Sequence, residues 1–415
     1  MEAVPAGPEQ RLREAIARHR SGDHNLAEAG YREHLREHPH DPSALHFLGL
    51  LRNHQGRNEE AIKLMVAALE VDPDYVDAWS NLGIVYYQQR DLERAEFCAR
   101  KAIEIRPDFA NAYANLGMTL RARNACEEAL VAWGRALDLQ PEMRNIAIAY
   151  GHLLYRVNRL AEALEFYERW RSAAPDDPIP QHMLAALGGA KTPERASDGY
   201  VRATFDDFAE SFDRNLEELG YKAPQILFGA VTQSEALTRK VGLDILDLGC
   251  GTGLCGSLFR PLARRLVGVD LSPGMLSKAA IRAVYDQLNC GELTQWLAEC
   301  TQQFDVAIAT DVLCYFGELR PVFRNVRQVL RPGALFSCTL EKSPDEPPGS
   351  CADRAPFILR AHGRYQHDAV YVEAALKSAG LAVLSLTTDV LRYERRDAVT
   401  GLVIVARRPA ADADG

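Results

Sequence analysis

The chain has 415 residues, of which 47% are hydrophobic and 25% are charged, and its net charge is −9 at pH 7. This composition is that of a folded globular protein, and the length predicts two domains. The acidic balance argues against a nucleic-acid-binding protein, which would normally carry a basic domain or stripe. The nine cysteines include no CxxC pair with zinc spacing and are odd in number. They predict reduced structural thiols, not a metal or disulfide framework.

The first residues, MEAVPAGPEQRLREAIARHR, lack the basic and apolar regions of a secretory signal. No later run approaches the roughly 18 uninterrupted apolar residues that a membrane helix needs. We therefore expect a cytoplasmic protein without a membrane partner.

A 34-residue period occupies the first two fifths of the chain. Periods of this length predict stacked pairs of helices, with proline ending each second helix. The positions between the helices of a pair are mostly glycine or asparagine, which tolerate a left-handed turn. Proline recurs at Pro39, Pro73, Pro107, Pro141 and Pro175, and the turn positions are Gly22, Gly56, Arg90, Asn124 and Asn158.

The stretch from Asp77 to Asp108, DAWSNLGIVYYQQRDLERAEFCARKAIEIRPD, resembles the tetratricopeptide repeat in its Trp, Leu-Gly, Tyr, Ala and Pro positions. Five such units are counted over residues 8–177, and the first matches least well. The resemblance implies an all-α solenoid whose concave groove binds a peptide or a partner domain. The alternative, that the array only shapes the substrate entrance of the second domain, stays open.

Residues 178–198 are proline- and glycine-rich around one short apolar helix, and we interpret them as a cap on the last repeat followed by a linker. From residue 240, short apolar runs alternate with amphipathic helices. This pattern predicts a mostly parallel, seven-stranded sheet with helices on both faces, within a domain at 199–408. Ligands of such sheets bind at the carboxyl ends of the strands. The runs are DILDL, RLVGVD, DQLNC, DVAIAT, GALFSCTLE, LAVLSLTT and GLVIVAR.

The stretch LDLGCGTG follows the first of these strands and precedes a helix expected at 254–263. Its glycines, Gly249, Gly251 and Gly253, are spaced GxGxG, whereas a dinucleotide site needs GxGxxG. Asp247 would repel a pyrophosphate but can face the ammonium group of S-adenosylmethionine. Asp270, at the end of the second strand, can accept hydrogen bonds from ribose hydroxyls. An oxidoreductase with this fold is therefore disfavoured.

LDLGCGTG, VGVDLSPGML, FDVAIATDVLCYF and VLRPGALF together resemble the successive motifs of the Rossmann-like class I S-adenosylmethionine-dependent methyltransferases, over residues 200–408. The repeats before them resemble the arrangement of bacterial tetratricopeptide-containing methyltransferases. The resemblance implies that Met275 contacts the adenine; the alternative is that Met275 only packs in the core. The resemblance implies a methionine site at Gly249, Cys250 and Gly251, a ribose site at Asp270, adenine contacts at Leu271, Met275, Glu292 and Leu293, a methionine-carboxylate and substrate edge at Thr310 and Asp311, and a lid from Tyr200 to Phe212 that includes Phe205 and Phe208.

No pair of residues identifies itself as the acid and base of catalysis. The candidates are Asp311, Tyr315 after the fourth strand, and Tyr365 and His367 after an insertion at 342–364. His367 is preferred as general base because the ordinary pKa of histidine lies near neutrality. The alternatives are that it caps the helix starting at Asp368 or is simply exposed. No carboxylate cluster is evident at the strand ends, so we expect no catalytic metal.

The leading hypothesis is a methyltransferase that acts on a small-molecule, carrier-bound or protein acceptor. Oxygen, nitrogen, sulfur and carbon nucleophiles all remain open. The rival hypothesis is a scaffold in which the repeats recruit a partner and the cofactor domain is catalytically silent. The oligomeric state is not predicted.

Overall fold

The structure is a computed structural model that describes residues 7–206, 208–209, 212–237, 241–344, 355–394 and 397–410. The chain divides into two compact units, Met1–Ala163 and Leu164–Gly415. The predicted repeat array, 8–177, extends beyond this division, and the limits 178–198 for the cap and linker stay a proposal. Each unit is described by itself.

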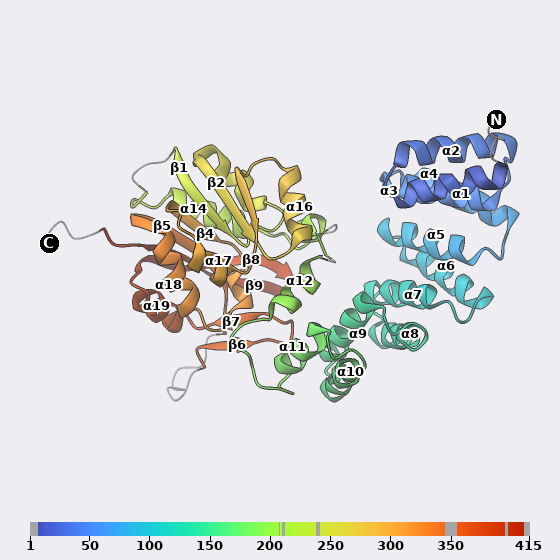
Figure 1. The fold of residues 1–415 in the computed structure, drawn as a ribbon. Helices are drawn as coiled ribbons and strands as arrows, with labels where there is room; N and C mark the ends of the chain where they lie inside the picture. The colour runs from blue at the N-terminus through green and yellow to red at the C-terminus, as the bar shows by residue number, and fades with distance from the viewer. Residues whose placement is uncertain are drawn as a thin grey trace. The chain divides into compact units, whose positions relative to one another are not determined.

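The first unit consists of helices that pack in consecutive pairs, as the 34-residue period predicts (Figure 1). At the turns within the pairs, the backbone takes the left-handed conformation, with φ values from 62° to 83°. Arg90 adopts it without being glycine or asparagine. The helices are α1 (Pro8–Arg20), α2 (His24–Glu37), α3 (Pro42–His54), α4 (Asn58–Val71), α5 (Val76–Gln88), α6 (Leu92–Ile105), α7 (Ala110–Ala122), α8 (Cys126–Leu139) and α9 (Arg144–Arg156), while α10 (Leu160–Ala173) crosses into the second unit.

The repeat glycines are small because helices cross closely there, and Gly117 in α7 shows this best. Trp133 of α8 is fully buried and its indole N–H donates to the backbone oxygen of Ala114 at 3.1 Å. A β-carbon added at Gly117 would lie 2.3 Å from the Trp133 ring. The rigid, hydrogen-bonded indole therefore requires glycine at this crossing.

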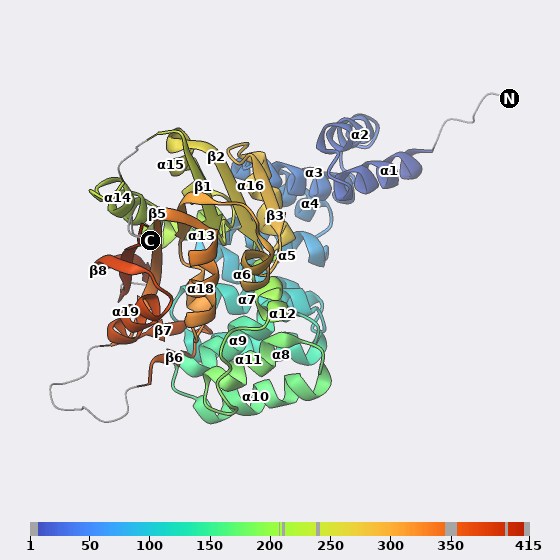
Figure 2. The ribbon, with the colours of Figure 1, turned by 60° about the vertical axis from the view of Figure 1, so that its left-hand side comes forward.

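The second unit is built on one mixed sheet with the strand order β3-β2-β1-β4-β5, continued from β5 by β9 and then β8 (Figures 1 and 2). The first five strands are parallel and β9 is antiparallel to β5 and to β8. This is the predicted seven-stranded sheet, to which β7 and β6 add two short strands at the end of β5. The bounds are β1 (Leu243–Leu248), β2 (Ala263–Asp270), β3 (Gln287–Cys290), β4 (Phe304–Ala309), β5 (Leu330–Lys342), β6 (Phe357–Leu359), β7 (Tyr365–His367), β8 (Ala382–Glu394) and β9 (Asp397–Arg407).

Helices cover both faces of this sheet. One apolar cluster joins the sheet to α17, α18 and α19, and another joins it to α14 and α15. The helix predicted at 254–263 is shorter than expected, because Pro261 falls in a 3-10 turn at Arg260–Leu262 and β2 begins at Ala263. The helices are α11 (Pro178–Ala186), α12 (Asp198–Asp206), α13 (Phe212–Glu218), α14 (Ala223–Thr232), α15 (Leu254–Phe259), α16 (Pro273–Ile281), α17 (Leu293–Glu299), α18 (Arg320–Val329) and α19 (Ala369–Ser378), with a 3-10 turn at Leu313–Tyr315.

Within the described ranges, no helix has both the length and the apolar character needed to cross a lipid bilayer.

The Gly117 crossing yields a matched pair of substitutions. Gly117→Ala forces the new methyl group into Trp133 and should lower the free energy of unfolding by about 1–3 kcal/mol, the usual cost of overpacking. Gly134→Ala, in the next helix, meets nothing closer than 3.8 Å and should be neutral or stabilise by up to about 1 kcal/mol through helix propensity. Urea denaturation followed by circular dichroism measures both. Equal effects of the two substitutions would contradict the close crossing.

Candidate active site

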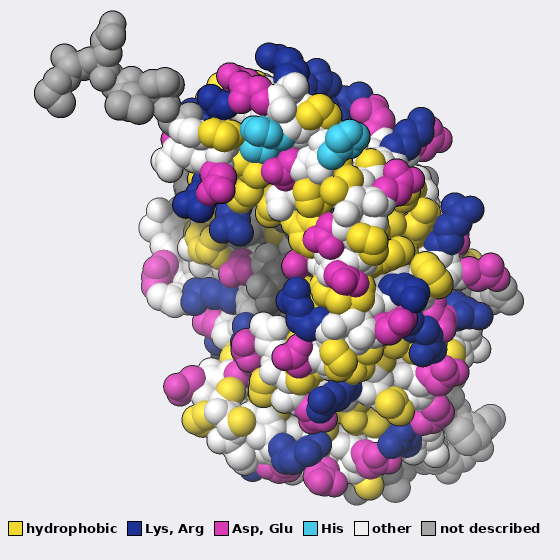
Figure 3. Space-filling model, turned by 90° about the vertical axis from the view of Figure 1, so that its right-hand side faces the viewer, with side chains coloured by type: hydrophobic (Ala, Val, Ile, Leu, Met, Phe, Trp, Pro, Cys, Tyr) yellow, Lys and Arg dark blue, Asp and Glu magenta, His cyan; other side chains and the backbone are white. Residues whose placement is uncertain are grey.

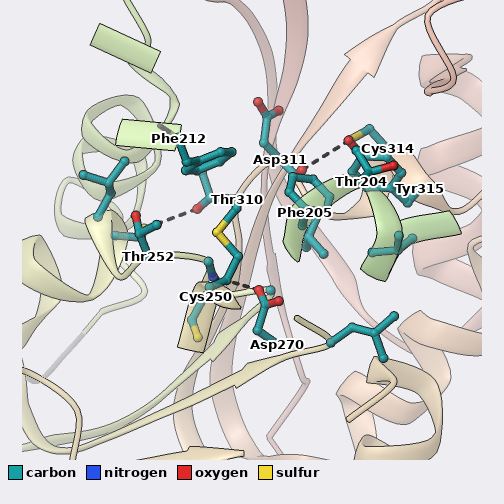
Figure 4. Close-up of a pocket in the computed structure, with 18 of the residues that line it drawn as sticks. Thr204, Phe205, Phe212, Cys250, Thr252, Asp270, Thr310, Asp311, Cys314 and Tyr315 are labelled. Carbon is teal, nitrogen blue, oxygen red and sulfur yellow. Dashed lines mark hydrogen bonds between the residues drawn. The ribbon is translucent and has the colours of Figure 1, made fainter. Parts of the chain in front are cut away.

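A cavity of about 340 Å³ opens at the carboxyl ends of β1, β2 and β4. Its size is typical of a pocket for a drug-sized ligand. Figure 4 shows Cys250 and Asp270 on one side of this pocket and Asp311 on the opposite side, with Thr310 and Phe205 between them in that view. Aromatic side chains supply much of the wall, at Phe205, Phe208, Phe212, Tyr221, Tyr315 and Phe316.

The glycine-rich turn after β1 forms one wall of the pocket. The amides of Gly249 and Cys250 both donate to the backbone oxygen of Val269, at 2.8 and 3.0 Å, which holds the turn against β2. Gly249 has φ +66°, and a β-carbon there would lie 2.3 Å from the side chain of Val312. The turn can therefore bring its backbone to the pocket only with glycine at this position.

Asp270 ends β2 and joins three backbone segments. One carboxylate oxygen accepts a hydrogen bond from the Gly251 amide at 2.8 Å, and the other accepts one from the Ser272 amide at 2.9 Å. Burial raises the pKa of this carboxyl above its ordinary value. Each oxygen keeps a second lone pair, so the carboxylate can also accept hydrogen bonds from a ligand in the pocket.

Asp247 lies at the base of the turn and is 1% exposed. The Tyr285 hydroxyl donates to its carboxylate at 2.7 Å. Burial outweighs this hydrogen bond and raises the pKa of Asp247 to about 7. A cation in the pocket would favour the ionised form, because a nearby positive charge stabilises a carboxylate.

Two buried carboxylate oxygens on the pocket wall have no hydrogen-bond partner among the described residues: Oε1 of Glu292 and Oδ1 of Asp311. The other oxygen of Glu292 accepts from the Gln295 amide at 2.8 Å and caps α17. Buried polar atoms are nearly always paired, so these two oxygens are available to hydrogen-bond donors of a ligand in the pocket.

The helices predicted as a lid, α12 and α13, are tied to the glycine turn and to α16 by two carboxylates. Asp206 accepts from the Ser272 hydroxyl and, at 3.2 Å, from the Gly274 amide. Asp213 accepts from the Thr252 hydroxyl at 2.5 Å and pairs with Arg282. These contacts place the aromatic side chains of the lid over the pocket.

Asp311 is held in a strained conformation, with φ +55°. Its backbone amide donates to the Thr339 hydroxyl at 2.9 Å, and its Oδ2 pairs with Arg392 at 2.8 Å. Burial raises the pKa of the Asp311 carboxyl, although Arg392 opposes the shift. Asp311 therefore combines a raised pKa with one carboxylate oxygen, Oδ1, that has no partner among the described residues.

Arg392 belongs to a buried group of charges beside Asp311. It also pairs with Glu341 and, at 3.1 Å, with Glu394, and Arg364 contacts both of these glutamates. Burial opposes ionisation of Glu341, but Arg364 and Arg392 outweigh it and lower its pKa to about 2. Three carboxylates thus face two guanidinium groups at one end of the pocket, and Arg392 is the only one of the guanidinium groups in this network that touches Asp311.

Most residues predicted for the site line this pocket together. They are Asp247, Gly249, Cys250, Gly251, Asp270, Leu271, Met275, Glu292, Leu293, Thr310, Asp311, Tyr315 and Phe212.

Four predicted residues do not line the pocket. His367, predicted as the general base, lies outside the pocket: it is fully buried, its Nε2 lies 3.2 Å from the Gly317 oxygen, and burial lowers its pKa to about 4. It does not cap α19 either, because Asp368 does so. The Tyr365 hydroxyl donates to the Pro193 oxygen at 2.8 Å in the core.

Tyr200 and Gly253 were predicted to contact the cofactor, but neither lines the pocket. The Tyr200 ring stacks on His182 with 3.8 Å between centroids and is 6% exposed, so it packs the base of the lid. Gly253 is the left-handed residue, with φ +90°, that precedes α15. It shapes the turn but does not face the cavity. Residues 345–354 of the predicted 342–364 recognition loop lie outside the described residues.

Sequence reasoning missed Tyr221, Arg392 and Glu394, which line the pocket together with Asp311. Tyr221 precedes α14, and the other two lie at the end of β8. Arg392 and Glu394 stand two residues apart on a strand and therefore on the same face. Opposite charges spaced this way at the end of an apolar strand are the signal that could have indicated a buried pair.

The buried charges predict a large effect of removing Arg392. Arg392→Met leaves Glu341 and Asp311 without their shared partner and should destabilise the protein by about 3–5 kcal/mol. Arg407→Met, at the exposed end of β9, is the control and should change the free energy of unfolding by less than about 1 kcal/mol. Urea denaturation compares the two variants. Equal stabilities would show that the network does not hold Asp311.

Residues 246–336 match the model of a methyltransferase domain. Residues 39–89, 76–109 and 109–178 match models of the tetratricopeptide repeat.

Among curated relatives, a ubiquinone biosynthesis O-methyltransferase of Chelativorans is 28% identical over 41% of this chain and 74% of its own length. A malonyl-[acyl-carrier protein] O-methyltransferase of Yersinia pestis is 29% identical over 38% of this chain and 57% of its own length. A phosphoethanolamine N-methyltransferase 1 of Arabidopsis thaliana is 28% identical over 45% of this chain and 40% of its own length. For the latter two, the alignment covers less than two thirds of the relative.

A solved structure of magnesium protoporphyrin IX methyltransferase from Synechocystis with bound SAH is 17% identical, with a TM-score of 0.39 over 51% of this chain and 100% of that one. The family models place the repeat matches before the methyltransferase-domain match along the chain, and the curated relatives are methyltransferases. The chain therefore carries tetratricopeptide repeats followed by a class I methyltransferase domain homologous to the S-adenosylmethionine-dependent enzymes.

Proposed function

We propose that the second unit binds S-adenosylmethionine in the pocket at the strand ends and transfers its methyl group to an oxygen or nitrogen acceptor. The observation that supports this most is that the Asp270 carboxylate and the unpartnered Oε1 of Glu292 lie on one wall of the pocket, beside a glycine turn. A nucleoside needs acceptors for its ribose hydroxyls and for its amino group, and these two carboxylates offer both.

The residues of this wall fit the cofactor in its chemical groups. Asp270 would accept from the ribose hydroxyls, and Glu292 would accept from the adenine amino group, with Leu271 and Met275 packing against the base. Asp247, whose pKa burial raises to about 7, would pair with the ammonium group of the methionine part. The cofactor, when bound, supplies an already activated methyl group, so the protein mainly positions the acceptor in line with it.

The acceptor side of the pocket combines aromatic walls with one unpaired carboxylate oxygen. Phe205, Phe212 and Tyr315 suit an apolar or aromatic body, and Phe205 packs against both of the other rings. Oδ1 of Asp311 has no partner among the described residues and requires a donor. An acceptor with an O–H or N–H group on an apolar body satisfies both features.

Asp311 would then accept the proton that the nucleophile loses as the methyl group arrives. Its pKa, raised by burial, makes the carboxylate a stronger base than an exposed aspartate. Arg392 keeps Oδ2 occupied and so directs Oδ1 at the acceptor. This assignment replaces His367 as the preferred base.

The repeats would serve recognition of a partner or of the acceptor's carrier, as arrays of this kind commonly do. Figure 3 shows acidic and basic side chains interspersed on the face it presents, a surface that suits protein contacts better than a nucleic-acid backbone. A cytoplasmic location stays a prediction.

Cofactor binding is the first test. Calorimetry should give a saturable signal with S-adenosylmethionine and with its demethylated product. Asp270→Asn, which replaces one carboxylate oxygen by an NH2 group and so places a donor against one of the two backbone amides, should weaken binding by about tenfold or more. Glu292→Gln should weaken it by a similar factor, whereas Glu299→Gln, an exposed residue at the end of the same helix, should leave it unchanged.

Absence of heat with either compound, in a folded protein, would overturn the proposal. It would favour the rival hypothesis, a repeat-based scaffold with a silent cofactor domain. A signal with nicotinamide dinucleotide instead would revive the oxidoreductase.

The role of Asp311 has its own test. Asp311→Asn should lower transfer of a labelled methyl group from S-adenosylmethionine to acceptors in a cell extract by about a hundredfold, the usual weight of a general base. Affinity for the cofactor should stay close to that of the wild type. Asp389→Asn, on the exposed part of β8, is the matched control. Full turnover in Asp311→Asn would remove Asp311 from the chemistry.

A further inference from the structure

The first repeats contain a cluster of three histidines that the proposed function does not use. His19 lies near the end of α1, His24 is the first residue of α2, and His54 is the last residue of α3. One nitrogen from each ring lies within 4.8 Å of the others. Sequence spacing gave no sign of this cluster, because its members come from three helices.

The distances suit a shared metal ion. Nε2 of His19 lies 3.2 Å from Nδ1 of His54. Two ligands of a tetrahedral zinc ion, each at about 2.0–2.1 Å, are about 3.3 Å apart. The His24 ring lies 5.7 Å from that of His19 and 6.3 Å from that of His54, between centroids, which closes the triangle.

A hydrogen bond to Tyr31 fixes the orientation of the His19 ring. Its other nitrogen, Nδ1, lies 3.1 Å from the hydroxyl of Tyr31, which is fully buried. Metal-binding histidines are commonly oriented by a hydrogen bond of this kind at the nitrogen that does not bind the metal. The contact aims Nε2 of His19 at the other two rings.

The repeat itself supplies an internal comparison. A shift of 34 residues takes the three histidines to Asn53 near the end of α3, Asn58 at the start of α4 and Gln88 at the end of α5. There the Asn53 amide donates to Asn58 at 3.1 Å and to Gln88 at 2.6 Å. Packing at these positions is therefore satisfied by amides, and the repeat has no need of histidine.

We propose that His19, His24 and His54 form a binding site for a divalent transition-metal ion of the zinc class. Imidazole nitrogens suit zinc, copper and nickel. Three protein ligands leave a fourth position to water or to a side chain of a bound partner. The ion would join α1, α2 and α3 and stabilise the first repeats.

The test uses the full chain, freed of metal with a chelator and titrated with zinc chloride. The wild type should bind one more zinc ion per chain than the triple variant His19→Asn, His24→Asn, His54→Gln. This variant installs the amide set that the next repeat already carries, so it should fold. Each single change should weaken that binding by about tenfold or more, because even the loss of a residue that only hydrogen-bonds to a metal ligand typically costs about tenfold in affinity.

Two further readouts make the outcome decisive. His40→Asn, an exposed histidine in the turn between α2 and α3, should bind zinc like the wild type. Cobalt(II) should give the visible spectrum of a tetrahedral site in the wild type but not in the triple variant, and zinc should raise the melting temperature of the wild type alone. Equal zinc stoichiometry in wild type and triple variant, no binding by the wild type, or loss confined to one single variant would overturn the site.

Discussion

The carboxylate of Asp270 is the interaction on which the cofactor side of the pocket depends. It accepts backbone hydrogen bonds from Gly251 and Ser272 and thereby fixes the end of β2, the glycine turn and the start of α16 in one arrangement. Ser272 in turn binds Asp206 of the lid. A single charged group at a strand end therefore sets both the ligand-binding backbone and the position of the aromatic side chains above it.

The acceptor side follows a different physical rule, since it is built by burying charges. Glu341, Arg364 and Arg392 are buried together beside one end of the pocket, and their mutual attraction offsets the cost of desolvation. The strained backbone at Asp311 is maintained because Thr339 and Arg392 hold both its amide and one of its carboxylate oxygens. Oδ1 of Asp311 is left without a partner among the described residues, and the proposed function assigns it to the acceptor.

The cofactor side could be predicted from the sequence because its residues follow one another at the ends of consecutive strands. Strand ends converge in a parallel sheet, so Asp247 and Asp270 were predicted from their place in the pattern, and the resemblance to methyltransferase motifs added Glu292 and Asp311; all four line the pocket. The repeats were predictable for a similar reason, since a fixed period fixes each residue's neighbours.

The rest depends on contacts that no local pattern records. Arg392 reaches Asp311 across 81 positions of the chain, and His367 is buried by β6 and β7, two short strands that the apolar runs did not predict. Histidine was preferred for its ordinary pKa, but burial removes the property on which that preference rested. The histidine cluster of the first repeats likewise arises only from the packing of three helices.

The most direct test of the account is a crystal structure of the full chain with the demethylated product of S-adenosylmethionine. The account predicts density in the pocket at the strand ends, with the ribose hydroxyls on Asp270, the adenine amino group on Oε1 of Glu292, and Asp311 facing the sulfur side. Density at another place, or ribose and adenine turned away from these two carboxylates, would contradict it.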